Sequence, residues 1–251
     1  MENKNLHIEQ FESTKIETKI SYPNHFCICG PTQSGKSHLI ASILDNIDQV
    51  FSFQNSMSNK KLVIVSPLDR AEIADLMHSK LEWEITLFNV LDFDSDFENQ
   101  LNKCFKISQN DINILLFDDY LVQMSEKQMK IINRIYATYR HMNVSVFSSI
   151  HSYDQRFVTV FEQSAMILVL YGFSQITFLR NALKHHFYKG TASIVRAIRN
   201  VYEKSQGAHK YLALNFSKRA IASEQYFITD NIFNPSKGIV LKQILNKLII
   251  K

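Results

Sequence analysis

Short apolar runs recur along the chain, and segments with helical spacing of apolar residues separate them. Five runs are hydrophobic on both faces, at 25–29, 61–67, 113–119, 143–150 and 164–173, and the run 113–119 ends in two acids. Strands that are apolar on both faces lie inside a parallel sheet that helices cover on both sides. The pattern therefore predicts an α/β fold with a mostly parallel central sheet. Further strands are expected within 83–91 and at 210–216.

Helices are predicted where apolar residues return every three or four positions. One helix should begin at Gly35 or Lys36, and its apolar face runs from Leu39 to Ile47. Another should begin at Ser125, a residue type that caps helix N-termini. The remaining predicted helices cover 71–80, 94–107, 174–205 and 238–250.

The composition, with 45% hydrophobic and 21% charged residues in 251, is that of an ordinary globular protein. The longest apolar run, AMILVLY, is too short to cross a bilayer, and the polar N-terminus carries no secretory signal. The three cysteines form no disulfide framework, and Cys27 and Cys29 are expected to be buried free thiols in a reducing setting. We therefore expect a soluble intracellular protein without stable membrane insertion.

Charge is distributed unevenly along the chain. Residues 1–179 carry 15 Lys and Arg against 21 Asp and Glu, whereas residues 180–251 carry 13 against 3. A basic C-terminal third indicates a polyanionic partner, and nucleic acid is the first choice. Charge alone leaves open a second reading, a solvated basic face that has no partner.

The stretch FCICGPTQSGKSHLI joins an apolar strand to a helix through a loop that matches GxxxxGK[ST]. In such a loop backbone N–H groups face phosphate oxygens, and the helix N-terminus adds positive potential. Lys36 is expected to reach the β- and γ-phosphates, and the Ser37 hydroxyl to bind Mg²⁺. The predicted nucleotide-binding residues are Gly30, Pro31, Thr32, Gln33, Ser34, Gly35, Lys36, Ser37 and His38.

Two acids, Asp118 and Asp119, end the apolar strand NILLFDD. Asp118 is predicted to hold Mg²⁺, and Asp119 to orient or deprotonate the attacking water. Burying two unpaired carboxylates would be costly, which argues against a purely structural strand end. Read without the loop motif, the acids could simply start a surface loop.

At least one strand lies between the loop motif and the acid pair, as in the P-loop division with an inserted strand and a catalytic acid. The chain has no NKxD-type guanine-reading motif, so ATP is the expected nucleotide. The strand 143–150 should lie beside the loop and present a γ-phosphate sensor, with Ser149 and His151 as candidates and His151 preferred. The alternative is that His151 is an ordinary surface histidine without a role in the site.

ATPases of this division often use an arginine from a neighbouring subunit to complete the site. Arg140, just before the strand 143–150, is the best candidate for that role. Arg134, Arg156 and Arg180 are less well placed along the chain, and any one of these arginines could be an ordinary surface residue.

The segments GPTQSGKS, LLFDDY and YRHMNVSVFSSIHSY together resemble the genome-packaging ATPases of the FtsK–HerA superfamily. The similarity is strongest to those of poxviruses, giant viruses, virophages and Polinton-like elements, and covers residues 24–234. The segments SAMILVLYGFSQITFLRNALKHHF and YLALNFSKRAIASEQYFITDNIF are also similar to the closing strand and tail of the family. The loop motif is generic to P-loop proteins, whereas RHMNVSV and the closing strand are more specific. His151 departs from the family, which usually has glutamine or asparagine there, and many members have Asp-Glu where this chain has Asp118 and Asp119.

The resemblance implies an ATPase that uses ATP and Mg²⁺ to drive double-stranded DNA into a viral capsid, as a homo-oligomeric ring of five or six copies. It also implies capsid proteins as further partners and a location in the host cytoplasm, virus factory or virion. The basic residues available to DNA phosphates include Lys184, Lys189, Arg196, Arg199, Lys218 and Arg219.

Three regions are expected: an N-terminal arm (1–24), a P-loop ATPase core (25–190) and a basic C-terminal elaboration of the same domain (191–251). Two other functions stay open. One is a P-loop kinase or another non-motor P-loop enzyme, although no arginine-rich lid is evident in the sequence. The other is a nucleotide-binding scaffold without ATPase activity, which the histidine at position 151 would permit.

Overall fold

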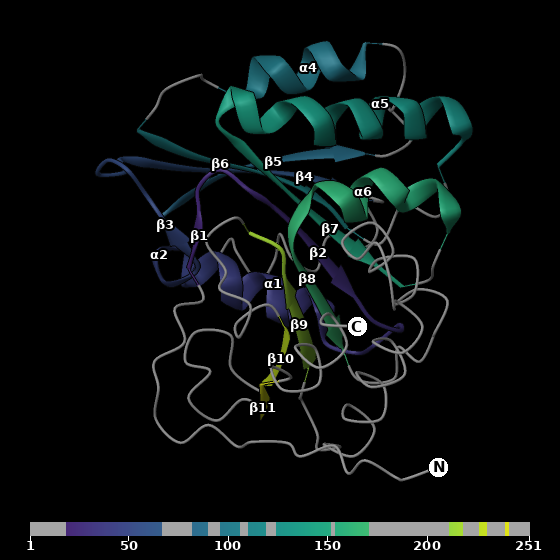
Figure 1. Cartoon of the computed structure of the whole chain (residues 1–251). Helices are drawn as coiled ribbons and strands as arrows, with labels where there is room; N and C mark the ends of the chain where they lie inside the picture. The colour runs from purple at the N-terminus through teal and green to yellow at the C-terminus, as the bar shows by residue number, and fades with distance from the viewer. Residues whose placement is uncertain are drawn as a thin grey trace, which may run out of the picture.

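The central feature of the computed structural model is a nine-stranded mixed sheet (Figure 1). The structure describes residues 19–66, 82–89, 96–105, 110–118, 124–151, 154–170, 211–217, 226–229 and 239–240. The strands, in spatial order, are β11 (Ile239–Val240), β10 (Tyr226–Thr229), β9 (Tyr211–Asn215), β8 (Ser164–Leu170), β2 (His25–Cys29), β7 (Val144–Ile150), β6 (Asp111–Phe117), β4 (Asn59–Ser66) and β5 (Trp83–Asn89).

The six strands from β8 to β5 are mutually parallel, and β9, β10 and β11 continue the sheet in antiparallel pairs. Strand β7 lies between β2 and β6, although both are earlier in the chain. The predicted α/β P-loop fold with an inserted strand is therefore confirmed.

Helices cover both faces of the sheet (Figure 1). One face carries α1 (Lys36–Asp45) and α2 (Ile47–Val50), and the other carries α4 (Phe97–Cys104), α5 (Glu126–Thr138) and α6 (Val158–Gln163). Two 3-10 turns, η4 (Tyr139–Met142) and η5 (Gln155–Phe157), precede β7 and α6. A second small sheet pairs β1 (Ile20–Ser21) with β3 (Phe51–Ser52).

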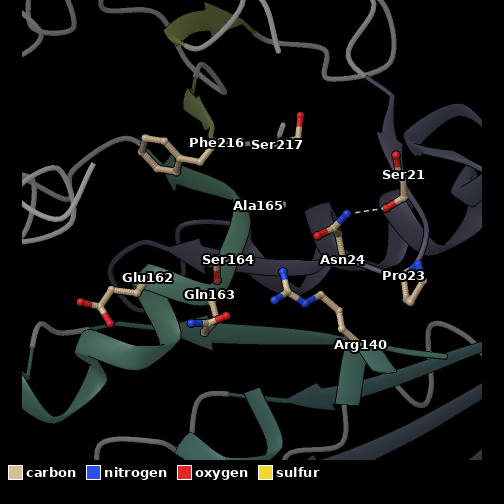
Figure 2. A pocket seen from close by; sticks show the side chains of 10 residues that line it. All are labelled: Ser21, Pro23, Asn24, Arg140, Glu162, Gln163, Ser164, Ala165, Phe216 and Ser217. Carbon is tan, nitrogen blue, oxygen red and sulfur yellow. Dashed lines mark hydrogen bonds between the residues drawn. The ribbon is translucent and has the colours of Figure 1, made fainter. Parts of the chain in front are cut away.

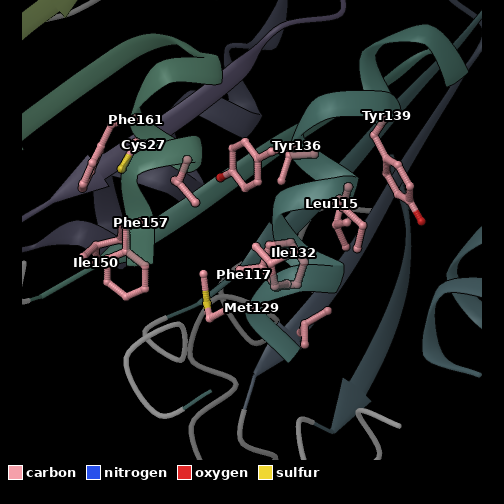
Figure 3. Close-up of a cluster of buried hydrophobic side chains, with 14 of the residues drawn as sticks. Cys27, Leu115, Phe117, Met129, Ile132, Tyr136, Tyr139, Ile150, Phe157 and Phe161 are labelled. Atoms are coloured by element: carbon pink, nitrogen blue, oxygen red, sulfur yellow. The ribbon is translucent and has the colours of Figure 1, made fainter. Parts of the chain in front are cut away.

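Each face of the sheet has its own hydrophobic cluster, and alternation along the strands assigns side chains to one or the other. On β7, Val146 and Ile150 belong to the cluster under α5 and α6, whereas Phe147 belongs to the cluster under α1. Figure 3 shows the α5 side of the sheet, where Ile150 lies close to Phe157. Residues 149 and 151 lie two and four positions after Phe147, so alternation places them on the α1 side as well.

The local predictions hold best where a capping or turn signal is explicit. Ser125 is the N-cap of α5, and it forms a capping box in which its hydroxyl accepts from the N–H of Gln128. The first helix ends at Asp45, two residues before the end of its predicted apolar face, so Ile47 belongs to α2. Cys27 and Cys29 are buried free thiols as predicted, with their Sγ atoms 3.5 Å apart, and burial raises the pKa of Cys27.

One predicted helix, over 238–250, is wrong at its start. Ile239 and Val240 form β11 and pair with Ile228 and Phe227 of β10. Both residues are β-branched, and pairing with a neighbouring strand overrides the weak helical spacing there. The rest of that segment, the predicted helices over 71–80 and 174–205, and residues 1–18 lie outside the described residues, and the three-region division stays a prediction. Among the described residues, no helix has both the length and the apolar character needed to cross a membrane.

Candidate nucleotide-binding site

The loop between β2 and α1 adopts a conformation that requires glycine at two positions for two different reasons. Gly35, the N-cap of α1, has a φ of 88°, which strains any residue with a Cβ, although a Cβ there would meet nothing within 4 Å. Gly30 is limited by space, since a Cβ would lie 2.4 Å from Ser34 Oγ and 2.9 Å from Leu170 Cβ. The loop is therefore closely wound, and we refer to residues 30–37 as the cradle.

Lys36 is the one charged residue of the cradle, and it is buried, with 4% of its surface exposed. Its Nζ donates to the carbonyl oxygens of Gly30 at 3.2 Å and Pro31 at 3.1 Å, so the side chain folds back over the loop. Ser34 Oγ is buried and has no hydrogen-bond partner among the described residues. A buried ammonium, an unsatisfied hydroxyl and the N-terminus of a ten-residue helix together fit a bound phosphate group.

The remaining cradle residues differ in exposure. Ser37 is partly exposed in the first turn of α1, where its hydroxyl can bind a metal ion that accompanies a phosphate. Thr32, Gln33 and His38 are exposed, and Gln33 has a φ of 63°.

Asp118 follows directly on β6 at the same edge of the sheet as the cradle. Its carboxylate is nearly buried, with 6% of the residue exposed, and its backbone N–H donates to the carbonyl of Val65 at 3.1 Å. Leu116 belongs to the α1-side cluster, so alternation directs Asp118 toward the face that carries Lys36. Asp119, the predicted catalytic acid, lies outside the described residues.

His151 is the first residue after β7, the strand that separates the cradle strand from the Asp118 strand. Cys29 pairs with Ile150, and the N–H of Gly30 donates to the Ile150 carbonyl at 3.0 Å. The partly exposed His151 therefore begins beside the first residue of the cradle. The other candidate sensor, Ser149, is 1% exposed and lies one strand position deeper on the same face.

Arg140 lies at the opposite edge of the sheet. It belongs to η4, which enters β7 at its amino end, whereas the cradle follows the carboxyl end of the parallel strand β2. A seven-residue strand spans on the order of 20 Å, so Arg140 does not reach the cradle of its own chain. The structure thus brings Lys36, Ser37, Asp118 and His151 to one edge and leaves Arg140 at the other.

The Arg140 side chain points into a pocket of about 420 Å³ between the amino ends of β2 and β8 (Figure 2). Most of the residues that line the pocket are polar or charged, among them Asn24, Gln163 and Ser217. Arg140 forms no hydrogen bond or ion pair with another described residue. Arg134 and Arg156 differ in this respect, because each is bound to a carboxylate of its own chain, Glu98 and Asp154 respectively.

His25, a buried residue of the cradle strand, was not anticipated from the sequence. Its Nδ1 accepts from the N–H of Val146 at 2.9 Å, and its Nε2–H donates to the carbonyl of Tyr136 at 3.0 Å. Burial lowers the pKa of His25 to about 3, with a smaller contribution from the charge of Arg140. The neutral ring connects β2 to β7 and α5 through these two hydrogen bonds. The only sequence signal for this role is a polar residue inside an apolar run.

No family model and no curated protein sequence matches this chain. Solved structures do match. The DNA-packaging ATPase B204 of Sulfolobus turreted icosahedral virus is 14% identical, with a TM-score of 0.52 over 82% of this chain and 96% of that one. B204 of Sulfolobus turreted icosahedral virus 2 in complex with ATP-gammaS gives the same values. The cytoplasmic domain of the type VII secretion ATPase EccC of Thermomonospora curvata, 12% identical, has a TM-score of 0.51 over 89% of this chain and 28% of its own. At these identities the likeness establishes a shared fold.

Proposed function

We propose that this protein is an ATP-hydrolysing motor that moves double-stranded DNA into a viral capsid. The observation that carries the proposal is the order β2, β7, β6, which sets the cradle, His151 and Asp118 side by side at one sheet edge. The fold likeness to the packaging ATPase B204, which extends over 96% of that chain, supports the same assignment.

The chemistry of the proposed site follows from the residues of the cradle and its neighbours. Lys36 exchanges the carbonyls of Gly30 and Pro31 for the β- and γ-phosphate oxygens of ATP. Ser37 and Asp118 hold Mg²⁺, which offsets the negative charge of the phosphates when bound. His151 donates a hydrogen bond to the γ-phosphate, the role that glutamine or asparagine has in similar ATPases. Asp119 orients or deprotonates the attacking water.

The ring belongs to the proposal because Arg140 does not reach the cradle of its own chain. Arg140 has no carboxylate partner among the described residues and lies at the edge of the sheet away from its own cradle. A head-to-tail contact would bring this edge to the cradle edge of the next copy, and such contacts close into rings. Arg140 then stabilises the charge on the γ-phosphate of the neighbour, in a ring of five or six copies.

The partners and location follow from the same assignment. Double-stranded DNA is bound through phosphate contacts of basic residues in the C-terminal third, which include Lys184, Lys189, Arg196, Arg199, Lys218 and Arg219; all six lie outside the described residues. Capsid proteins are the further partners, in the host cytoplasm, the virus factory or the virion. Within the FtsK–HerA superfamily we assign the chain to the poxvirus, giant-virus, virophage and Polinton-like type.

Steady-state ATP hydrolysis by the purified protein, with and without long double-stranded DNA, tests this function. We expect Mg²⁺-dependent hydrolysis that DNA stimulates several-fold and that Lys36→Ala abolishes. Hydrolysis that is indifferent to DNA would instead indicate another P-loop enzyme, and phosphate transfer to an added acceptor would identify a kinase. Nucleotide binding without hydrolysis would indicate a scaffold.

A further inference from the structure

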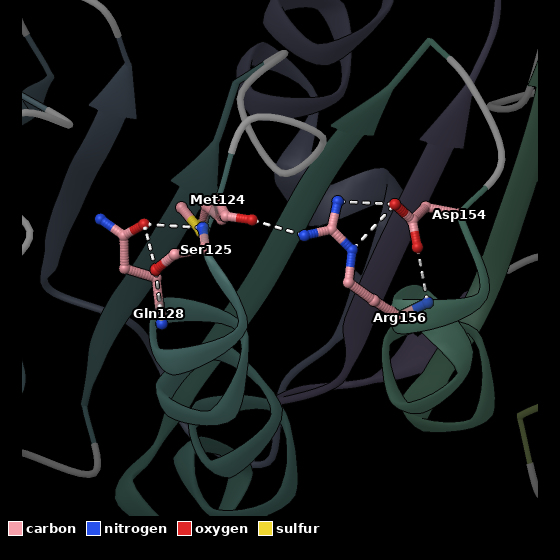
Figure 4. A network of polar contacts seen from close by, with 5 residues as sticks. All are labelled: Met124, Ser125, Gln128, Asp154 and Arg156. Carbon is pink, nitrogen blue, oxygen red and sulfur yellow. Dashed lines mark hydrogen bonds and ion pairs between the residues drawn. The ribbon is translucent and has the colours of Figure 1, made fainter.

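A polar link joins the chain segments that leave β7 and β6 (Figure 4). Nη2 and Nε of Arg156 donate to Asp154 Oδ2 at 2.6 and 2.8 Å, and the Arg156 backbone N–H donates to Asp154 Oδ1 at 2.8 Å. The third branch of the guanidinium, Nη1, donates to the carbonyl oxygen of Met124 at 2.5 Å. One side chain thus connects Asp154, three residues after His151, with Met124, six residues after Asp118.

The Met124 end of this link is anchored. Met124 is 1% exposed and belongs to the same hydrophobic cluster as Phe117 and Ile150, the last residues of β6 and β7. The next residue, Ser125, forms the capping box with Gln128, in which Gln128 Oε1 accepts from the Ser125 N–H at 2.9 Å. A displacement of Met124 therefore moves the first turn of α5 with it.

The geometry of the link suits arginine better than lysine. A guanidinium offers donors in a rigid plane, so it can serve a carboxylate and a carbonyl at once, which a lysine ammonium does less well. The Arg156 and Asp154 side chains are 30% and 23% exposed, and ion pairs near the surface contribute only about 0–1 kcal/mol to stability. The effect of the link should therefore appear in the geometry of the site more than in the stability of the fold.

We propose that Arg156 is a positioning residue that couples the His151 side of the nucleotide site to the Asp118 side. When His151 contacts a nucleotide, the link through Asp154 and Arg156 transmits the displacement to Met124 and the first turn of α5. The catalytic consequence rests on the ATPase function proposed above. Transmission of the displacement through the link requires only that nucleotide binds, not that it is hydrolysed.

Kinetic constants of Arg156→Gln test the catalytic consequence, with Arg134→Gln as the matched control. Arg134 also pairs with a carboxylate, but it joins α5 to Glu98 of α4, away from the site. We expect kcat of the Arg156 variant to fall about tenfold or more with KM for ATP within about twofold, because misplaced groups lose rate before they lose substrate binding. Arg156→Lys should recover only part of the loss, and Arg134→Gln should leave both constants unchanged. A kcat of Arg156→Gln within twofold of the wild type, or an equal loss in Arg134→Gln, overturns the proposal.

Amide hydrogen exchange separates this proposal from the function on which its kinetics rest. In the wild type, Mg²⁺ and ATP should slow exchange both in the cradle (30–37) and at residues 124–128. In Arg156→Gln the cradle should still be protected, while the change at 124–128 disappears. If the wild type binds ATP without hydrolysing it, the proposed function fails. The exchange measurement then still shows whether Arg156 transmits the effect of nucleotide binding to residues 124–128. Persistence of the change at 124–128 in the variant, or its absence in the wild type despite a protected cradle, overturns the link.

Discussion

The N–H of Gly30 donates a 3.0 Å hydrogen bond to the carbonyl of Ile150, which joins the first residue of the cradle to the last residue of β7. This contact explains why His151 begins beside the cradle, although the two are more than a hundred residues apart in the chain. It also holds Gly30 where Ser34 and Leu170 leave no space for a side chain. The geometry of the candidate site therefore depends on the missing side chain at Gly30 as well as on Lys36.

The two cradle glycines should respond differently to alanine. Gly30→Ala places a Cβ 2.4 Å from Ser34 Oγ, so the loop must shift, whereas Gly35→Ala meets no atom within 4 Å and adds only backbone strain. That strain costs about 1–2 kcal/mol. Titration with a fluorescent ATP analogue should show a larger loss of affinity in Gly30→Ala than in Gly35→Ala. Equal losses in the two variants would mean that steric contact at Gly30 does not shape the cradle.

Replacing His151 should affect turnover more than nucleotide binding. His151→Ala removes a hydrogen-bond donor that lies beside the cradle, and loss of such a donor lowers kcat by about 100-fold or more when it acts in the transition state. His151→Gln should keep most of the activity, because glutamine can also donate to phosphate. Ser149→Ala is the control, since Ser149 lies deeper on the same face. If kcat falls in Ser149→Ala and not in His151→Ala, Ser149 is the sensor.

The location of Arg140 leads to a subunit-mixing prediction. Arg140→Ala and Lys36→Ala should each be inactive alone, because each removes one side of a shared site. A mixture of the two should regain activity wherever an intact cradle meets an intact Arg140 from its neighbour. ATP hydrolysis measured against the mixing ratio should therefore pass through a maximum.

Mixing Lys36→Ala with Asp118→Asn provides the control for that experiment. Both residues lie at the same sheet edge of one chain, so no combination of these subunits contains a complete site. This mixture should stay inactive at every ratio. Recovery in the control, or none in the Arg140 mixture despite ring assembly, would contradict a role of Arg140 across subunits.

Protonation of His25 should make the fold sensitive to acid. Burial lowers the folded-state pKa of His25 to about 3, whereas the unfolded chain has a pKa of about 6.5. Between these values the unfolded chain binds a proton that the folded protein excludes, so the stability present above pH 6.5 is lost as the pH falls toward 3. Urea unfolding at pH 7 and pH 5 should show that the wild type loses ~2 kcal/mol more than His25→Asn does. An identical pH dependence in both proteins would show that His25 is not the group responsible.

Much of the site could be predicted from the sequence because its chemistry is local. The cradle needs glycines, a lysine and a hydroxyl within eight consecutive positions, and the acid that we expect to bind the metal must end an apolar strand. Ser125 likewise predicted the start of α5, because a cap and its partner lie within one helical turn. Asp119 stays a prediction, since it lies outside the described residues.

Other features could not be predicted in this way because they depend on which strands become neighbours. The polar link of Arg156 to Met124 spans 32 residues and His25 to Val146 spans 121, and neither pair has a local pattern. The strand β11 was predicted as part of a helix, because its spacing was read without its partner β10.

The sequence by itself determined the α/β class, the cradle with its lysine and hydroxyl, and the acid at the end of a buried strand. It also predicted that the strand 143–150 lies beside the cradle and carries His151 there. Only the tertiary structure decided that this strand, β7, separates β2 from β6, and that Arg140 lies at the far edge. The physical reason is that turn and capping chemistry acts over a few residues, where the chain is already connected. Strand order depends on how whole hydrophobic faces are buried against each other, and these faces come from segments far apart in the chain.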